Sequence, residues 1–396
     1  MLRFLTAGES HGPSLTVIVE GLPSGLAITA EQIGDQLARR RLGYGRGPRM
    51  RFERDELRIV GGVRHGRTLG SPVAVEILNS EWPKWEQEMS AAPGRASNKL
   101  TAPRPGHADL AGMQKYAFDD ARDVLERASA RETAARVVAG SLAKALLSSI
   151  GVEIVSHVVR IGTVASDPGV RPGPDELALV DESEVRCFDR ASEQTMIAEI
   201  KAAAKEGDSL GGLVEVIAYG VPVGLGSYVH WDRKLDGLIA AGLMSIQAVK
   251  AVEIGDGFAQ ASQRGSVAHD AIARDERFAT GGGYIRRSDH AGGLEGGMSS
   301  GAPIIARVAM KPLATLNRPV LETVDVATGE STVSFKERTD VTAVPALGVV
   351  AEAMLALVLA NEAARKFGGD SLGEFVRNYA SYIANLGSTS SSAHEE

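Results

Sequence analysis

The chain has a single cysteine, Cys187, among 396 residues, and aromatic side chains make up only 5% of it. One cysteine excludes an internal disulfide framework and is typical of proteins that fold in a reducing compartment. We find no apolar run of about 18 residues, the length that spans a bilayer, and no basic-then-apolar signal at the N-terminus. These absences predict a soluble, cytoplasmic protein.

Two common ligand-binding signatures are also missing. The stretch GYGRGP, at residues 43–48, lacks the third glycine of a dinucleotide-binding turn and does not stand between a strand and a helix. The eight histidines are dispersed, and Cys187 has no second cysteine with which to share a metal. The sequence therefore predicts neither a nicotinamide-binding domain nor a metal site.

Lysine is absent from one strongly basic segment. The net charge of the chain is −7, yet ten arginines and three acidic residues lie between Arg39 and Arg67. A guanidinium group matches phosphate and carboxylate in a bidentate fashion, whereas an ammonium acts as a point charge. Glycines near Arg40, Arg46 and Arg49 indicate turns, which favours an anion site over a solvated basic face with ion pairs. A nucleic-acid-binding surface is the alternative, although the acidic net charge and the few aromatic residues argue against it.

Helical and strand-like patterns predict an α+β fold in which long helices pack against antiparallel sheets. Helices are expected at 29–42, 119–150, 232–254 and 345–367, from caps, apolar spacing and terminal glycines. Strands are expected at 15–19, 57–60, 73–77, 152–161, 213–219, 303–309 and 332–335. We expect one domain over residues 1–386 and a disordered polar tail at 387–396.

Two histidines stand on backbone flanked by glycine. His11 lies in GESHG, residues 8–12, and His107 lies in RPGHADL, two positions before Asp109. Glycine permits tight turns and close approach to a ligand, and a nearby aspartate can fix the tautomer of an imidazole. Either histidine is a structural turn residue or an acid–base group, and the pattern alone leaves both interpretations open.

Three further segments have the composition of ligand sites. In ERASARETAARVVAGSL, Arg127 and Arg131 are expected on one helix face, with surface ion pairs to Glu126 or Glu132 as the alternative. Five glycines between 292 and 301 favour a loop whose amides approach a ligand, the alternative being structural looseness. Asp340 precedes a buried helix, where it is either an ionised proton acceptor or an N-cap.

Taken together, these motifs resemble the chorismate synthase family over residues 2 to 365. The blocks that carry the resemblance are GESHG, RPGHAD, RASARETAARVVAGSLAK, SDHAGGLEGGMSSGAPIIARVAMKP and RTDVTAVPA, in family order. Two details depart from the family pattern: RASAR where a second serine is common, and SDHAGG where many members have asparagine. The resemblance implies a sandwich of long central helices between antiparallel sheets, assembled as a homotetramer.

The activity that the resemblance implies is the last common step of the shikimate pathway towards aromatic amino acids. 5-Enolpyruvylshikimate 3-phosphate loses phosphate in an anti-1,4-elimination and gives chorismate, a redox-neutral reaction that requires reduced FMN. A separate flavin reductase is expected to supply the reduced flavin, so NADPH would act only indirectly. A flavoenzyme of the same fold acting on another phosphorylated cyclic acid remains an alternative.

Roles for individual residues are likewise implied by the resemblance. His11 matches the proton donor to the departing phosphate, His107 matches the cation near flavin N1, and Asp340 matches the aspartate that works with flavin N5 in removing the C6 proton. The substrate-binding positions are Ser10, Arg40, Arg46, Arg49 and Arg131. The FMN-binding positions are Arg127, Ala128, Ser129, Gln247, Ala248, Gly296, Lys311, Pro312, Leu313, Ala314, Thr315 and Arg338. The stretch at 79–99 has no assigned role beyond a possible lid loop.

Overall fold

Two antiparallel sheets carry most of the long strands in the computed structural model, which describes residues 1–46, 56–318, 320–335 and 339–386. The first sheet has the order β1-β2-β6-β3 and the second β10-β15-β9-β7-β8. Their strands are β1 Arg3–Ala7, β2 Ser14–Glu20, β6 Val73–Leu78, β3 Glu56–Gly61, β10 Val249–Ile254, β15 Ile304–Met310, β9 Gly212–Tyr219, β7 Glu153–Ile161 and β8 Val164–Ala165. Alternate residues of β6 (Val73, Val75 and Ile77) are fully buried, as expected for a strand with one face on the core.

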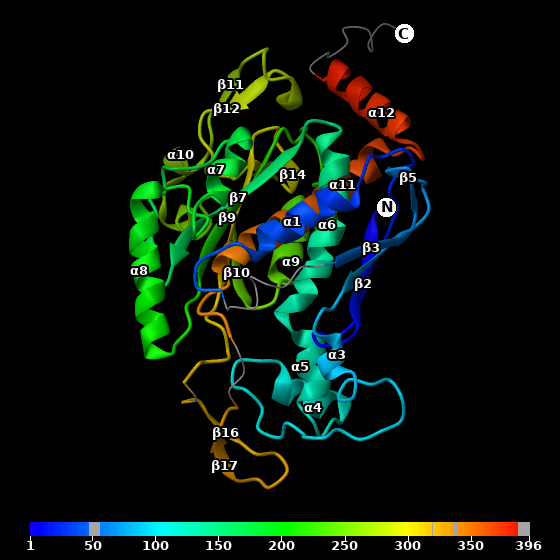
Figure 1. Cartoon of the computed structure of the whole chain (residues 1–396). Helices are drawn as coiled ribbons and strands as arrows, with labels where there is room; N and C mark the ends of the chain where they lie inside the picture. Colours follow the sequence, from blue (N-terminus) through cyan, green and yellow to red (C-terminus); the bar gives the residue numbers. More distant parts are fainter. Residues whose placement is uncertain (47–55, 319, 336–338, 387–396) are drawn as a thin grey trace, which may run out of the picture.

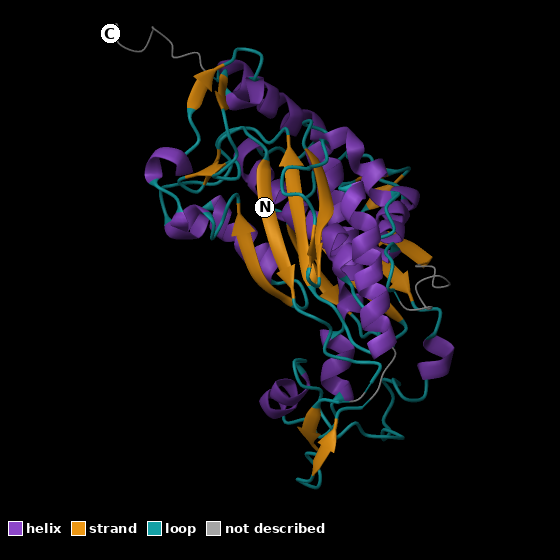
Figure 2. Ribbon diagram, turned by 90° about the vertical axis from the view of Figure 1, so that its left-hand side faces the viewer, coloured by secondary structure: helices purple, strands orange, loops and turns teal. Residues whose placement is uncertain are grey.

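Three long helices fill the space between the two sheets (Figures 1 and 2). Helix α6 (Thr133–Ser148) packs against β2 and β6, α11 (Val344–Phe367) packs against β7 and β9, and α1 (Ala30–Arg41) contacts α6, α11 and β3. A Cβ atom added at Gly140 of α6 would lie 2.3 Å from Cβ of Ala353 in α11, so glycine is required where these helices cross. The predicted α+β sandwich is confirmed.

Further helices and hairpins surround this core. The remaining helices are α3 Trp82–Trp85, α4 Asp109–Tyr116, α5 Arg122–Ala128, α7 Leu177–Asp181, α8 Arg190–Glu206, α9 Leu235–Met244, α10 Gly265–Ala268 and α12 Leu372–Asn385, with short 3-10 turns such as η1 Ala130–Glu132. Four two-stranded hairpins complete the described chain: β4 Val63–Arg64 with β5 Arg67–Thr68, β11 Ile272–Arg274 with β12 Tyr284–Arg286, β13 Leu294–Glu295 with β14 Met298–Ser299, and β16 Glu322–Val324 with β17 Ser331–Val333.

Two of the four predicted helices are wrong in extent. The expected helix at 119–150 is interrupted at Ser129, whose ψ of 142° directs the chain out of α5 before η1 and α6 begin. The expected helix at 232–254 ends at Met244, because Ala248 has a left-handed φ of +66° and the next residues pair with β15. The helices at 29–42 and 345–367 are confirmed to within a residue, and the predicted tail at 387–396 lies outside the described residues.

Helix α11 corrects the expectation that no apolar run is long enough to span a bilayer. By length and composition this 24-residue helix passes that test, because an 18-residue window within it has a mean hydropathy of 1.9. However, 89% of that window is buried inside the protein, where α11 packs between α6 and the second sheet. Its apolar character therefore has a structural explanation as the central helix of the sandwich.

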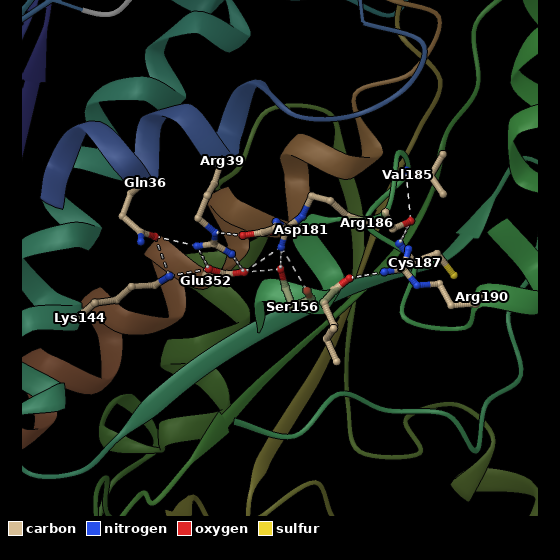
Figure 3. Close-up of polar contacts among 12 residues, drawn as sticks. Gln36, Arg39, Lys144, Ser156, Asp181, Val185, Arg186, Cys187, Arg190 and Glu352 are labelled. Carbon is tan, nitrogen blue, oxygen red and sulfur yellow. Dashed lines mark hydrogen bonds and ion pairs between the residues drawn. The ribbon is translucent and has the colours of Figure 1, made fainter. Parts of the chain in front are cut away.

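A buried ionic network joins α1, α6 and α11 (Figure 3). Glu352 of α11 accepts hydrogen bonds of 2.8 and 2.9 Å from the guanidinium of Arg39, 2.6 Å from Ser156 Oγ and 3.2 Å from Arg186, and it also contacts Lys144. Burial alone would raise the pKa of Glu352, but these cations hold it well below its ordinary value, while burial lowers the pKa of Lys144 to about 8. The network fixes the last turn of α1, from which the arginine-rich segment continues.

Candidate active site

The GESHG loop turns the chain from β1 back into β2. Gly8 has a φ of +101°, and a Cβ atom there would lie 2.3 Å from the carbonyl oxygen of Ser14, so only glycine fits. Bonds from other segments hold the loop, among them Ser10 N–H to Glu126 O (2.9 Å), Asn79 Nδ2 to Gly12 O (2.8 Å) and an Arg131 Nη to Ser10 O (2.8 Å). His11 is therefore displayed on a backbone that several other segments fix in place.

Three side chains that the sequence analysis did not assign enclose His11. Its Nδ1 lies 2.9 and 3.0 Å from the two carboxylate oxygens of Glu126, and its ring stacks on Trp85 with a centroid distance of 4.0 Å. Arg122 lies over the same indole ring and bonds to Glu126 (3.1 Å). Glu126 is the first residue of the ERASARET motif, but no local sequence pattern indicates that its partner is His11, at the start of the chain.

The break at Ser129 determines how the ERASAR segment faces that loop. Arg127, near the end of α5, donates to the Thr6 and Gly8 carbonyl oxygens, whereas Arg131, in η1, donates to Ser10 O. Ser129 Oγ donates to Ser10 Oγ (3.2 Å) and accepts from Arg131 N–H. The prediction that Arg127 and Arg131 share one helix face is wrong, because they lie in different elements. Both nevertheless bond to residues 6–10. Ala128, between them, is the last residue of α5.

Glu132 joins this segment to the end of α9. Its carboxylate accepts from Thr6 Oγ1 (2.8 Å), Arg136 Nε (2.8 Å) and Gln247 Nε2 (2.9 Å). A cavity of about 430 Å³ opens here, lined in part by Arg127 and Gln247. Arg127 and Gln247, both predicted to bind FMN, therefore line the same cavity.

A second group of charged residues surrounds His107. The His107 Nδ1 contacts the Asp109 carboxylate, as the sequence predicted, and Arg104 Nε donates to the same carboxylate (2.8 Å). Burial alone would raise the pKa of Asp109, but His107 and Arg104 hold it well below its ordinary value. Arg104 also donates to Thr315 Oγ1 (3.0 Å), so this group contacts the KPLAT turn at residues 311–315.

The KPLAT turn has the properties of an anion site. A Cβ atom added at Gly106 would lie 3.6 Å from Lys311 Nζ and 3.8 Å from Ala314 Cβ, so the turn packs against Gly106. Burial and the neighbouring Lys250 lower the pKa of Lys311. Among the residues that the structure describes, no carboxylate pairs with Lys311, so this half-buried ammonium lacks a counter-charge from the described chain.

Gln247 and Ala248 lie next to the KPLAT turn. Lys311 N–H donates to the carbonyl oxygen of Ala248 (3.0 Å), and Ala248 holds the left-handed φ of +66° noted above. Strained backbone of this kind is concentrated at functional sites. The Oε1 atom of Gln247 is buried and has no hydrogen-bond partner within the described ranges. Among the described residues, Gln247 with its unsatisfied acceptor and the strained Ala248 are therefore joined by a backbone hydrogen bond to Lys311, which has no carboxylate partner there.

Asp340 pairs with Arg46 at 3.2 Å, which joins the predicted proton acceptor to a predicted substrate-binding arginine. The N-cap interpretation of Asp340 is wrong, because Ala343 caps α11. Two residues that precede β9 link this segment to the KPLAT turn. Leu210 N–H donates to Val341 O (2.8 Å), and Ser209 Oγ donates to Leu313 O (2.8 Å), next to Pro312. Asp340 is thus connected to the predicted flavin site.

The two ends of the arginine-rich segment differ in exposure. The arginines at positions 58, 64 and 67 are exposed, the first of them to 64%. At the start of the segment Arg40 is only 6% exposed, and the side chains of Arg39 and Arg46 are 12% and 9% exposed. A solvated basic face and a nucleic-acid groove both require exposed guanidinium groups, so neither alternative fits these three residues. Arg49 and Arg338, predicted to bind substrate and FMN, lie outside the described residues.

Gly296 is the predicted flavin residue that lies apart from the others. It stands in the turn between β13 and β14, next to Gly297, whose carbonyl oxygen accepts from Leu235 N–H at the start of α9. Gln247 follows the other end of α9, and ten helical residues span about 15 Å. A Cβ atom on Gly296 would meet nothing within 4 Å, so this turn presents an open side.

Comparisons with known proteins agree with this geometry. The family model described as chorismate synthase matches residues 2–364. Proteins named chorismate synthase from Salinispora tropica and Thermobifida fusca are 59% and 58% identical to this chain, each alignment covering 98% of it and 99% of the relative. A solved structure titled "Crystal Structure of Chorismate Synthase" is 40% identical, with a TM-score of 0.78 over 98% of both chains. This chain therefore belongs to the chorismate synthase family and is a lyase of the shikimate pathway.

Proposed function

We propose that the chain converts 5-enolpyruvylshikimate 3-phosphate into chorismate and phosphate by anti-1,4-elimination, with reduced FMN bound beside the substrate. One observation carries the assignment of roles. Each of the three groups expected to move or hold a proton is paired with a partner of opposite charge: His11 with Glu126, His107 with Asp109, and Asp340 with Arg46. Such partners fix the protonation and orientation that acid–base groups require.

The residues near the KPLAT turn fit a bound flavin mononucleotide. Lys311, which has no carboxylate partner in the described part of the chain, offers its positive charge to a phosphate or an anionic ring edge. The Oε1 of Gln247, likewise without a partner there, offers an acceptor to a ring N–H or a ribityl hydroxyl. Reduced FMN, when bound, supplies the electron density that helps the phosphate leave. His107 would place a positive charge at the flavin, held in orientation by Asp109.

The substrate carries a phosphate and two carboxylates, so its site must supply several cations. We assign Arg40, Arg46, Arg49 and Arg131 to these groups, together with the hydroxyl of Ser10. In support of this, Arg131 donates to the backbone of Ser10, the residue beside His11, and Ser129 Oγ lies 3.2 Å from Ser10 Oγ. A guanidinium group near the phosphate would place that group within reach of the imidazole.

His11 and Asp340 divide the proton transfers. His11 gives a proton to the departing phosphate oxygen, which neutralises the leaving group as the C3–O bond breaks. Asp340 takes up the proton that leaves C6, and the Arg46 guanidinium, 3.2 Å away, orients this carboxylate before the transfer. Since one proton is given and one is accepted, the elimination leaves the net charge of the protein unchanged.

We further propose a single catalytic domain over residues 1–386, a homotetramer, a cytoplasmic location and a separate flavin reductase. The outer face of the first sheet supports self-association, because Leu5 and Ile18 lie directly opposite each other on β1 and β2 and are 72% and 43% exposed. We propose that Gly296, which lies at the far end of α9 from Gln247, contacts the flavin bound by a second copy of the chain. Light scattering on the purified protein tests the tetramer.

The decisive experiment is anaerobic. Purified protein is mixed with 5-enolpyruvylshikimate 3-phosphate and chemically reduced FMN, and phosphate release is followed together with the diene absorbance of the product. We expect both signals to rise together, and only with reduced flavin. If substrate and FMN bind but neither signal appears, the substrate assignment is wrong, and so are the roles given to His11, His107 and Asp340.

A further inference from the structure

Glu126 is a buried carboxylate at the centre of the His11 environment. Its side chain is only 1% exposed, and it accepts the backbone N–H of His11 (2.8 Å) as well as a bond from Arg122 (3.1 Å). Burial alone would raise the pKa of Glu126, but the hydrogen bonds and charges of His11 and Arg122 outweigh it and hold the pKa below its ordinary value. The carboxylate therefore stays ionised beside the imidazole.

The geometry determines which ring nitrogen of His11 carries a proton. Nδ1 lies 2.9 and 3.0 Å from the two oxygens of an ionised carboxylate, which can only accept, so Nδ1 must be the donor. Nε2 is then on the opposite side of the ring, and within the described ranges no protein group bonds to it. The His11 side chain is 16% exposed, so this nitrogen is the part of the ring that remains available to a ligand.

Trp85 covers one face of the same ring. The two rings stack with centroids 4.0 Å apart and planes inclined by 30°, and the Arg122 guanidinium lies 5.1 Å from the indole centroid. Asn79, a few residues before Trp85, bonds to Gly12 O through Nδ2 and accepts from Glu81 N–H through Oδ1. The beginning of the 79–99 stretch, for which the sequence predicted no role, is thus attached to the His11 loop through Asn79 and covers the imidazole through Trp85.

We propose that Glu126 is the positioning residue of His11: it holds the proton on Nδ1, directs Nε2 to the substrate phosphate and stabilises the imidazolium form beneath Trp85. This inference rests on the proposed role of His11 as proton donor. Charged groups that face His11 are Glu126 and Arg122 from α5, Arg131 from η1 and Glu9 from the loop itself, which approaches Gly12. Of these, Glu126 is the one bonded to the ring.

Trp85 provides a readout that does not depend on turnover. The chain has three tryptophans, so replacing Trp82 and Trp231 with phenylalanine leaves Trp85 as the only one. A stacked imidazolium quenches indole emission more than a neutral imidazole does, so a pH titration of Trp85 fluorescence follows the protonation of His11. His11→Asn in this background must abolish the titration, which assigns the signal.

The expected shifts have opposite signs in two variants. Glu126→Gln removes the counter-charge, so the midpoint of the titration moves to lower pH, and Glu126→Asp returns it towards the wild-type value. Arg122→Gln removes a competing cation, so the midpoint moves to higher pH. Glu215→Gln is the matched control, because Glu215, on β9 of the second sheet, is also a buried carboxylate bound to a histidine and to arginines. Its replacement should leave the midpoint unchanged.

Activity supplies the second readout. In the anaerobic assay, Glu126→Gln should lower kcat by on the order of 10²-fold with little change in KM, and the alkaline limb of its pH profile should move to lower pH. Equal titration midpoints in wild type, Glu126→Gln and Arg122→Gln would overturn the proposal, as would a wild-type pH profile in Glu126→Gln. If the wild-type protein shows no turnover, the proposed function fails, while the fluorescence titration still decides whether Glu126 positions His11.

Discussion

The Asp340 carboxylate and the Arg46 guanidinium lie 3.2 Å apart although they come from opposite ends of the chain. Their side chains are 21% and 9% exposed, so the pair is only partly screened by solvent. A substrate anion that binds Arg46 must therefore share this guanidinium with Asp340. Substrate binding and proton acceptance are coupled through one ion pair, which is why the two residues should respond differently to substitution.

Asp340→Asn should lower kcat by on the order of 10²-fold or more, because an amide cannot accept the C6 proton. Substrate affinity should change little, since Arg46 stays in place. Steady-state kinetics under anaerobic conditions measure both effects. Asp35→Asn, which alters an exposed carboxylate on α1, is the control and should behave as wild type. A normal kcat in Asp340→Asn would remove this aspartate from the mechanism.

Arg46→Lys keeps a positive charge but loses the planar fork that can serve a carboxylate and a substrate anion together. We expect KM for the substrate to rise about tenfold, which corresponds to about 1.4 kcal/mol of lost binding. The same kinetic assay checks this, with Arg377→Lys on α12 as an arginine control remote from the proposed site. An unchanged KM would show that Arg46 serves only the ion pair.

How far the sequence predicted this fold depended on whether the deciding interactions were local. The start of α1 was predictable because Thr29 and Gln32 form a capping box within four residues. The break at Ser129 was not, because the flanking residues favour a helix and the contacts that stabilise the turn reach Ser10. Likewise, residues 249–254 have apolar spacing typical of a helix, but pairing with β15 makes them a strand.

The same distinction applies to the site. The contact between His107 and Asp109 was predictable because the residues are two positions apart and stand beside a glycine. The contact between His11 and Glu126 was not predictable, because it joins the loop after β1 to α5, and no local sequence pattern distinguishes Glu126 from the other glutamates. Lys311 was assigned from family resemblance, and only the structure shows that it lacks a carboxylate partner among the described residues.

Lys311→Met should weaken FMN binding by roughly 10- to 100-fold, the usual effect of losing a hydrogen bond to a charged group. The free energy of unfolding of the free protein should not fall, because the substitution removes a half-buried charge without a counter-ion in the described chain. Quenching of flavin fluorescence gives the affinity and urea unfolding gives the stability. Lys205→Met, on the exposed side of α8, is the control; equal FMN affinities in both variants would contradict the assignment.

Asp109→Asn should weaken FMN binding about tenfold. The reason is that His107 loses the carboxylate that orients its ring, while Arg104 loses the acceptor that fixes it beside Thr315. Flavin titrations of the two proteins test this. Asp119→Asn, which removes an exposed partner of Lys99, should leave the affinity unchanged.

Glu352→Gln should destabilise the protein by about 3–5 kcal/mol, the usual cost of removing one member of a buried ionic group. The carboxylate is fully buried and is the shared partner of Arg39, Lys144 and Arg186, so its loss leaves three cations crowded between the helices. Urea unfolding at neutral pH measures the change. Glu206→Gln, at the exposed end of α8, is the control and should be neutral.

The pH dependence of stability offers an independent check on this network. The pKa of Glu352 in the folded protein lies below its value in the unfolded chain, which is about 4.3. Its contribution to the free energy of unfolding is therefore fully present above that pH and is lost as the pH falls through the folded value. Glu352→Gln should accordingly show a shallower loss of stability in acid than wild type. Parallel acid profiles for the two proteins would mean that the network stabilises by packing and hydrogen bonds rather than by the charge of Glu352.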